Sequence, residues 1–427
     1  MKLADIDLLD RDRFTEGIPH EWFTFLRHEA PVYKHPEPGG RGFWVVTKHD
    51  DVVAVGRDAS TYSSAQDRGG VVALEDPTPE MLAAMGEDGG PAAMAEGNMM
   101  LMMDPPAHTR YRLLVNKGFT PRMISALEPH IQALARQVVD NVIERGECDF
   151  VVDVAAELPL LVITEMLGVP VEDRHKVFEW SNRMIGSEDP EYQVGAEAVS
   201  AAQIEMFMYA DALRQQRQQE ARDDIVTELL QAEMDGDKLT ELDFDLFFLL
   251  LAVAGNETTR NAIAHGMNAL LENPDQFELL VDDPALARTT ATEEILRWAS
   301  PVMYFRRNVT QDTELRGQRI PAGDKVSIWY VSANRDEEVF EDPFRFDIRR
   351  DPNEHVAFGG GGPHFCLGSN LARMEIRLLF EEIAQRIPEM RLAGKPDPLR
   401  SNFIGGIKHL PVTFPPGSRR VETAGHQ

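Results

Sequence analysis

The sequence predicts a mainly α-helical fold with a minor β region. Most of the chain carries apolar residues at helical spacing, and the longest such segment extends from Lys238 to Glu272. No linker, repeat or low-complexity tract divides the 427 residues, so we expect one domain over residues 1–427 with flexible tails at 1–12 and 416–427. Four short runs are predicted to be strands: Gly42–Thr47, Glu314–Ile320, Lys325–Val331 and Ile407–Phe414.

The composition narrows the class of protein. A net charge of −28 argues against nucleic acid as a partner, because phosphate binding needs clustered Lys and Arg. The only cysteines are Cys148, interpreted as structural, and Cys366, which together favour a reducing cytoplasm over a disulfide framework. The charged N-terminus lacks a signal-peptide core, and the longest apolar run, Leu246–Gly255, is too short to span a bilayer. We therefore expect a soluble, cytoplasmic monomer with no transmembrane segment.

Helical periodicity accounts for most of the remaining chain. In the first helix, for example, Trp22, Phe25 and Leu26 stand at i, i+3 and i+4. The predicted helices are His20–Ala30, Asp50–Gly56, Asp104–Val115, Pro121–Arg145, Glu157–Leu167, Val171–Ile185, Tyr192–Gln219, Asp223–Glu233, Lys238–Glu272 and Pro284–Ala299.

The segment from Gln66 to Met103 shows no clear period and is longer than an ordinary connection. It contains seven methionines, a residue type that suits irregular apolar ligands. We interpret it as a functional loop or lid, and the alternative is a mobile surface loop.

The helix Lys238–Glu272 has an unusual centre. Thr240 and Asp243 form a capping-box-like start. Inside the helix lies AGNETTR, residues 254–260, whose polar groups are costly among apolar neighbours. A solvent-exposed polar face would explain them, but the apolar residues before it indicate that this helix enters the core.

The stretch His355–Phe380, HVAFGGGGPHFCLGSNLARMEIRLLF, combines an apolar strand end, a run of four glycines, a thiol and the start of a helix. Glycines let a backbone pass close to a bulky group, and the N-terminus of a helix favours the thiolate of Cys366. A flat cofactor held by one thiolate would explain the stretch. The alternative is a cysteine that packs as a small hydrophobic residue beside a flexible loop.

Together with AGNETT, Glu294-Ile-Leu-Arg297 and HTRYR at 108–112, this stretch resembles the cytochrome P450 superfamily, of the soluble bacterial, actinobacterial type. The resemblance covers roughly residues 22–414. It implies a triangular prism with haem b between a long central helix and the helix of the cysteine loop. It also implies that Cys366 is the axial iron ligand.

The resemblance assigns further residues to haem. Phe358 shields the sulfur, and Gly361 and Gly368 match signature glycines, although the Phe358–Cys366 spacing is one residue longer than the commonest form and leaves the individual glycines open. Partners for the haem propionates are His108, Arg112, Arg307 (with Arg306 as a competing choice) and His364. Glu294 and Arg297 are implied to be a structural ion pair that joins the segment containing Asn334–Arg335.

Glu257 and Thr258 match the acid–alcohol pair that delivers protons during O₂ activation in the family. Their presence favours an O₂-dependent monooxygenase that hydroxylates an unactivated C–H bond. Two alternatives remain open: a peroxide-driven oxygenase on the same scaffold, and a non-enzymatic haem- or lipid-binding protein.

The chain has no flavin, nicotinamide or iron–sulfur fingerprint. Electrons are therefore expected from ferredoxin and ferredoxin reductase, with NAD(P)H used only indirectly. A basic docking face is predicted from Arg110, Lys117, Arg122, Arg349, Arg350, Arg373 and Arg377, with scattered solvated charges as the alternative.

The resemblance also implies an apolar substrate pocket. The predicted contacts are Met99, Met100, Ile185, Val253, Ala254, Val302, Phe305, Phe403 and Ile404. With the longer cysteine loop, they resemble enzymes that act on sterols, methyl-branched lipids or terpenoids.

Overall fold

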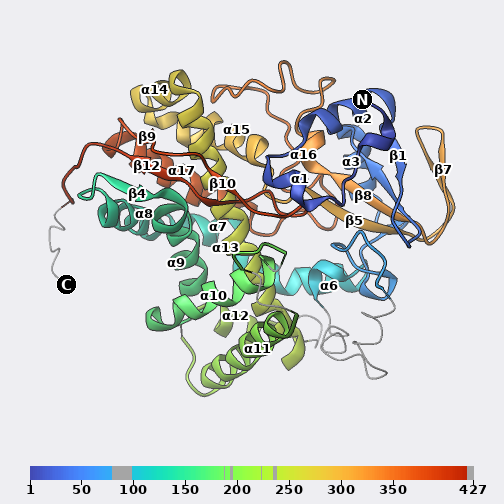
Figure 1. Cartoon of the computed structure of the whole chain (residues 1–427). Helices are drawn as coiled ribbons and strands as arrows, with labels where there is room; N and C mark the ends of the chain where they lie inside the picture. Colours follow the sequence, from blue (N-terminus) through green and yellow to red (C-terminus); the bar gives the residue numbers. More distant parts are fainter. Residues whose placement is uncertain (79–98, 187, 193–195, 223, 234–237, 421–427) are drawn as a thin grey trace.

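The computed structural model describes residues 1–78, 99–186, 188–192, 196–222, 224–233 and 238–420. Helices make up most of it, and the long helix α13 crosses the helical part of the molecule, while the largest sheet lies on the side of the N-terminus (Figure 1). The main helices are α1 (Arg11–Thr15), α2 (His20–Glu29), α3 (His49–Arg57), α6 (Ala107–Val115), α7 (Pro121–Ala126), α8 (Glu128–Val142), α9 (Glu157–Met166), α10 (Arg174–Ile185), α11 (Ala196–Gln219), α12 (Ile225–Gln231), α13 (Glu241–Glu272), α14 (Pro274–Asp282), α15 (Thr290–Ala299), α16 (Tyr330–Ala333) and α17 (Ser369–Arg386).

Most helix predictions are confirmed, and the differences have local causes. The predicted helix Pro121–Arg145 is two helices, because Pro129 begins a new first turn in α8 and cannot continue α7. The predicted helix Pro284–Ala299 is likewise a 3₁₀ turn, Pro284–Arg288, followed by α15. Helix α14 was not predicted.

Helix α13 begins as the sequence predicts. The Thr240 hydroxyl accepts a hydrogen bond from the Asp243 backbone N–H at 3.1 Å, and the Asp243 carboxylate accepts one from the Thr240 N–H at 3.1 Å. This reciprocal cap fixes the first turn of a 32-residue helix. Its length lets one element pack against α9, α11, α15 and α17.

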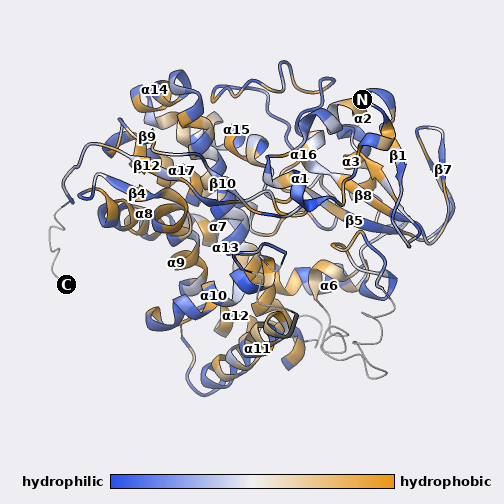
Figure 2. Cartoon of the chain, viewed as in Figure 1, coloured by the Kyte–Doolittle hydropathy of each residue, from blue (hydrophilic) through white to orange (hydrophobic). Residues whose placement is uncertain are grey.

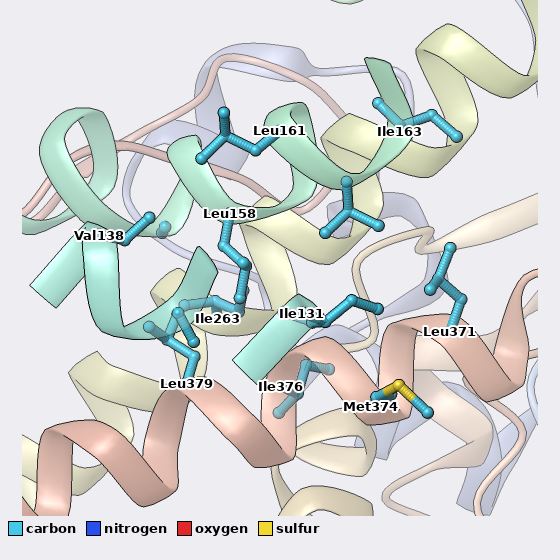
Figure 3. Close-up of a cluster of buried hydrophobic side chains, with 14 of the residues drawn as sticks. Ile131, Val138, Leu158, Leu161, Ile163, Ile263, Leu371, Met374, Ile376 and Leu379 are labelled. Carbon is cyan, nitrogen blue, oxygen red and sulfur yellow. The ribbon is translucent and has the colours of Figure 1, made fainter. Parts of the chain in front are cut away.

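The main hydrophobic core lies where α13 meets these helices. Figure 3 shows Ile263 of α13 among Leu158 of α9, Val138 of α8 and Leu379 of α17. These side chains are buried, so the core holds α13 and α17 at a fixed separation. Apolar residues follow the inward faces of these helices in Figure 2.

The largest sheet has the strand order β1-β2-β8-β5-β3. β2 and β8 pair in parallel and the other neighbours are antiparallel. The strands are β1 (Val32–His35), β2 (Phe43–Val46), β3 (Tyr62–Ser63), β5 (Tyr304–Val309) and β8 (Lys325–Trp329). β5 was not predicted as a strand, and its two central arginines obscured the apolar pattern.

Smaller sheets complete the β region. The predicted strand Glu314–Ile320 is a hairpin of β6 (Thr313–Leu315) and β7 (Gln318–Ile320). The predicted strand Ile407–Phe414 divides into β11 (Ile407–His409), which pairs with β10 (Asp397–Pro398), and β12 (Pro411–Thr413), which lies between β4 (Glu147–Asp149) and β9 (Arg391–Leu392).

The N-terminal residues 1–12 differ from the predicted flexible tail. Ile6 and Leu8 are buried, and Arg11 forms ion pairs with Glu75 and Glu188. Burial of these apolar side chains holds the segment on the body of the protein. In the other predicted tail, 416–427, residues 421–427 lie outside the described residues, as do 79–98 of the predicted loop Gln66–Met103.

Among the described residues, no helix has both the length and the apolar character that a bilayer span requires. The prediction of a single domain stays a prediction.

Candidate active site

A cavity lies between α13 and the segment that contains Cys366. Its walls also include residues of α6, β5 and the start of α17. One wall carries the thiol, and the remaining walls are mostly apolar. Its apolar residues include Phe119, Phe247, Leu250, Leu251, Val302 and Phe305.

Cys366 stands just before α17, as the sequence predicts, and lines the cavity. Its backbone N–H donates to the Phe358 carbonyl at 3.0 Å, which closes the loop on itself. Burial raises the pKa of the Cys366 thiol, against the lowering effect of N–H groups from Gly368 and Ser369. Sequence reasoning expected the helix N-terminus to dominate, but burial outweighs it in the protein alone. Metal coordination deprotonates such a thiol outright.

The four glycines before Cys366 have separate roles. Gly359, Gly361 and Gly362 have positive φ, a conformation that favours glycine. Gly362 also touches α3, because a Cβ there would lie 2.5 Å from the Gly56 carbonyl oxygen. Gly361, predicted to contact haem, is not among the cavity residues: a Cβ there would meet Arg57. Gly359 lines the cavity instead.

Four basic or imidazole side chains converge on one end of the cavity: His108, Arg112, Arg307 and His364. The two imidazole rings lie 4.3 Å apart between centroids. Both ring nitrogens of His108 and Nε2 of His364 are buried without a hydrogen-bond partner. Burial lowers the pKa of His108 to about 4 and of His364 to about 2.

Neither of the two arginines has a carboxylate partner among the described residues: Arg112 donates to the Pro363 carbonyl at 3.1 Å and Arg307 to the Arg306 carbonyl at 2.8 Å. A guanidinium carries five N–H donors, so each arginine retains donors for a further acceptor in the cavity. The cluster therefore fits the carboxylates of an anionic ligand, and with the thiol it fits a haem with two propionates.

Strand alternation separates the two candidate arginines of β5. Successive side chains of a strand point to opposite faces. Arg307 faces the cavity, whereas Arg306 donates to Asn308 Oδ1 at 2.6 Å and to the Ala73 carbonyl at 2.6 Å on the other face. The structure thus favours Arg307, and Arg306 instead fixes the chain around residue 73.

Helix α13 forms the wall opposite the thiol. Ala254, Gly255 and Thr258 line the cavity, and the Thr258 hydroxyl donates to the Ala254 carbonyl at 2.7 Å. Such a bond engages a carbonyl four residues back and bends a helix locally. Glu257 is fully buried but is not among the cavity residues; its carboxylate pairs with Arg260.

Glu294 and Arg297 form the predicted ion pair, with both side chains fully buried. Two hydrogen bonds of 2.7 Å join them. Arg297 Nη1 also donates to the carbonyls of Asn334 and Pro343, both at 2.9 Å. Asn334 Oδ1 in turn accepts the Val356 N–H at 2.7 Å, so the pair fixes the chain that leads into the cysteine loop.

Several predicted substrate contacts lie outside the cavity lining: Met99, Ile185, Val253, Phe403 and Ile404. Phe403 packs behind the wall, on Phe305 and Tyr304. Met100, Ala254, Val302 and Phe305 do line the cavity.

Sequence reasoning missed Phe247, Leu250 and Leu251, which line the cavity from α13. They stand seven, four and three residues before Ala254, a spacing that places them on one helix face with it and could have found them. Phe119, on the turn before α7, carried no such signal.

The residues of the predicted basic face divide into two groups. Arg110, Arg122 and Arg349 are exposed, and the side chain of Lys117 is not among those that the structure describes. The other three have internal carboxylate partners: Arg373 bonds Glu293 at 2.7 Å, Arg377 bonds Glu128 at 2.6 Å, and Arg350 lies 3.2 Å from Glu294 with 11% of its side chain exposed. Arg350 thus belongs with the buried Glu294–Arg297 pair and not with an exposed docking face.

Comparisons with known proteins agree with this site. The family model of cytochrome P450 matches residues 289–391. A steroid C26-monooxygenase of Mycolicibacterium smegmatis is 42% identical over 99% of this chain and 96% of that protein. A methyl-branched lipid omega-hydroxylase of Mycobacterium bovis is 41% identical over 96% of this chain and 95% of that protein. The structure of a Mycobacterium marinum cytochrome P450 in complex with pseudoionone has a TM-score of 0.86, 39% identity and coverage of 96% and 98%.

The chain belongs to the cytochrome P450 family. It is a P450 monooxygenase that hydroxylates a hydrophobic substrate, and the family implies haem–thiolate iron and the use of O₂.

Proposed function

We propose that this enzyme hydroxylates the end of a branched aliphatic chain carried by a sterol or a methyl-branched lipid. The relatives support this choice, since one acts at steroid C26 and another at the ω position of a methyl-branched lipid. Both names place oxygen at a chain terminus. The observation that carries the proposal is the apolar cavity, whose wall opposite the thiol is built from Phe247, Leu250 and Leu251. Such a wall selects an aliphatic chain by excluding water.

The residues of the chain have definite tasks in this reaction. When bound, haem supplies the activation of O₂ and the insertion of one oxygen atom into a C–H bond. Cys366 would bind the haem iron through its thiolate, and His108, Arg112, Arg307 and His364 would hold the propionates. In the overall reaction, the substrate, O₂, two electrons and two protons are converted to an alcohol and water.

Proton delivery is assigned to α13. Thr258 lines the cavity with its hydroxyl-bearing side chain. Glu257, the preceding residue, carries a buried carboxylate. The Thr258 hydroxyl orients the O₂ that receives the protons, and the Glu257 carboxylate takes up a proton and passes it on.

We assign electron supply to a ferredoxin and its reductase, with NAD(P)H as the indirect source. The exposed Arg110, Arg122 and Arg349 support a docking face for an acidic partner.

The proposal is tested by product analysis. Holoenzyme with a ferredoxin and reductase is given cholesterol, an iso-branched fatty acid and its straight-chain isomer. We expect a low- to high-spin shift and a terminal alcohol with the first two substrates, and weaker turnover of the straight chain. Attack at a ring or mid-chain position, or preference for the straight chain, contradicts the substrate assignment. Equal rates with hydrogen peroxide alone contradict the role of the redox partners.

A second experiment tests the ligand. The reduced, carbon-monoxide-bound spectrum of the wild type is expected to show the red-shifted Soret band of thiolate ligation. Cys366→His should bind haem without that band, while Cys148→Ser retains it. A wild-type spectrum without the red shift contradicts Cys366 as ligand.

A further inference from the structure

The carboxylate of Glu257 faces away from the cavity that it is proposed to serve. Its side chain is fully buried, and one oxygen, Oε2, accepts a hydrogen bond from Nη2 of Arg260, one turn further along α13. The other oxygen, Oε1, has no partner. Thr258 lines the cavity, whereas neither Glu257 nor Arg260 does. The acid must therefore leave its cation, or share it, before a proton can pass to the cavity side.

A second helix holds the guanidinium of Arg260. Its Nη1 donates to Asn182 Oδ1 at 2.9 Å, and its central carbon lies 6.0 Å from the centroid of the Phe178 ring. Phe178 and Asn182 are four residues apart in α10, so they present one face of that helix to Arg260. With 7% of the Arg260 side chain exposed, this contact is shielded from solvent. α10 and α13 pack directly on each other, as Figure 1 also shows.

Two opposing effects act on Glu257. Burial is the larger and raises the pKa of its carboxyl above the ordinary value, while the charge and hydrogen bond of Arg260 offset part of that rise. In the part of the chain that the structure describes, Tyr192, in the connection after α10, also interacts electrostatically with Glu257 and with Arg260. Arg260 is thus the cation that opposes protonation of this acid, and α10 fixes where that cation stands.

We infer that Arg260, anchored to α10 through Asn182 and Phe178, is a positioning residue that favours the ionised form of Glu257 and holds its carboxylate away from the cavity. The position of α10 then sets how readily Glu257 takes up a proton and turns toward Thr258. This inference rests on the proposed role of Glu257 as the proton-delivering acid.

The test uses four variants of the holoenzyme. Arg260→Gln removes the cation, and Arg260→Lys retains a charge. Asn182→Asp adds a carboxylate on α10 that competes for Arg260. Arg183→Gln is the matched control, because Arg183 neighbours Asn182 on α10 but pairs with Glu179 on the outer side.

The first readout is infrared difference spectroscopy of the carboxyl region near neutral pH, without turnover. Arg260→Gln should show the carbonyl stretch of a protonated acid, which disappears in the double variant with Glu257→Gln. Asn182→Asp should show the same band more weakly, and Arg260→Lys and Arg183→Gln should match the wild type. Absence of the band in Arg260→Gln, or its presence in Arg183→Gln, overturns the inference.

The second readout is the pH profile of kcat with cholesterol as the probe substrate. If protonated Glu257 is required, the falling limb at high pH should move up by about one pH unit or more in Arg260→Gln, since an adjacent opposite charge lowers an acid's pKa by that amount. The Arg260→Lys profile should return toward that of the wild type. An unmoved profile together with the infrared band shows that Arg260 controls the acid but that the acid does not limit proton delivery, which refutes the proposed role of Glu257 and not the positioning.

Discussion

At the scale of single residues, the glycines of the cysteine loop have different structural roles. Gly359 lines the cavity, Gly360 and Gly362 pack on α3, and Gly361 faces Arg57. By contrast, Gly368 has a negative φ of −84° and nothing of the protein within 4 Å of a Cβ. The fold itself therefore requires glycine at 362 and leaves space at 368, on the cavity side.

Gly362→Ala should destabilise the protein. The new Cβ would lie 2.9 Å from Cα of Arg57 and would strain a backbone with φ of +79°, at a cost of about 1–3 kcal/mol or more. Gly368→Ala is the matched comparison and should leave the stability of the haem-free protein nearly unchanged. Urea unfolding of both haem-free variants measures this, and equal losses would contradict the assignment.

At the scale of elements, the Glu294–Arg297 pair connects α15 to the chain that precedes the cysteine loop. Glu294 also accepts the Asp347 N–H at 3.0 Å and the Asn353 amide at 3.0 Å. A surface pair contributes little, but a buried one that loses a partner leaves an uncompensated charge. The pair therefore sets the position of the thiol without contacting it.

Removing one partner should be more harmful than removing both. Arg297→Met is expected to cost up to about 3–5 kcal/mol of stability and to weaken haem retention, because Glu294 stays buried with only Arg350, 3.2 Å away, to balance its charge. The double variant Glu294→Gln/Arg297→Met should recover part of the loss. Arg288→Met, in a surface pair with Glu128 and Glu381, should cost less than about 1 kcal/mol. Denaturant unfolding gives all three free energies, and a double variant that is no more stable than Arg297→Met contradicts the coupling.

At the scale of the whole molecule, a net charge of −28 is spread over a fold that buries several acids. Asp245, where α13 packs on α11, is half-buried beside Asp211, Arg214 and Glu241. Burial raises its pKa from 3.8 to about 6, with Asp211 adding to the effect. Between these values the folded state binds more protons than the unfolded state, so global stability falls as pH rises.

Asp245→Asn should remove that part of the pH dependence. The stabilising effect of the raised pKa is fully present below about pH 4 and is lost as pH rises through about 6. The variant should therefore be more stable than the wild type at neutral pH, with the difference shrinking on acidification. Thermal unfolding across pH measures it, with the exposed Asp50→Asn as control. A difference independent of pH would contradict the assignment.

The sequence by itself determined the class of protein and the central helix with its cap, because these depend on residue spacing within short stretches of the chain. The role of Cys366 as iron ligand stays a prediction from the same kind of spacing. The sequence also predicted the Glu294–Arg297 ion pair, which the structure shows fully buried, whereas the roles of Glu257 and Thr258 in proton delivery stay predictions. Only the tertiary structure decided between Arg306 and Arg307, since strand alternation was invisible in a strand that was not recognised.

Tertiary packing likewise separated the four glycines and withdrew Glu257 from the cavity toward Arg260 and α10. It also placed Ile185 and Phe403 outside the cavity lining and Phe119 within it. Each of these outcomes depends on contacts between residues far apart in the chain, and local spacing carries no record of such contacts.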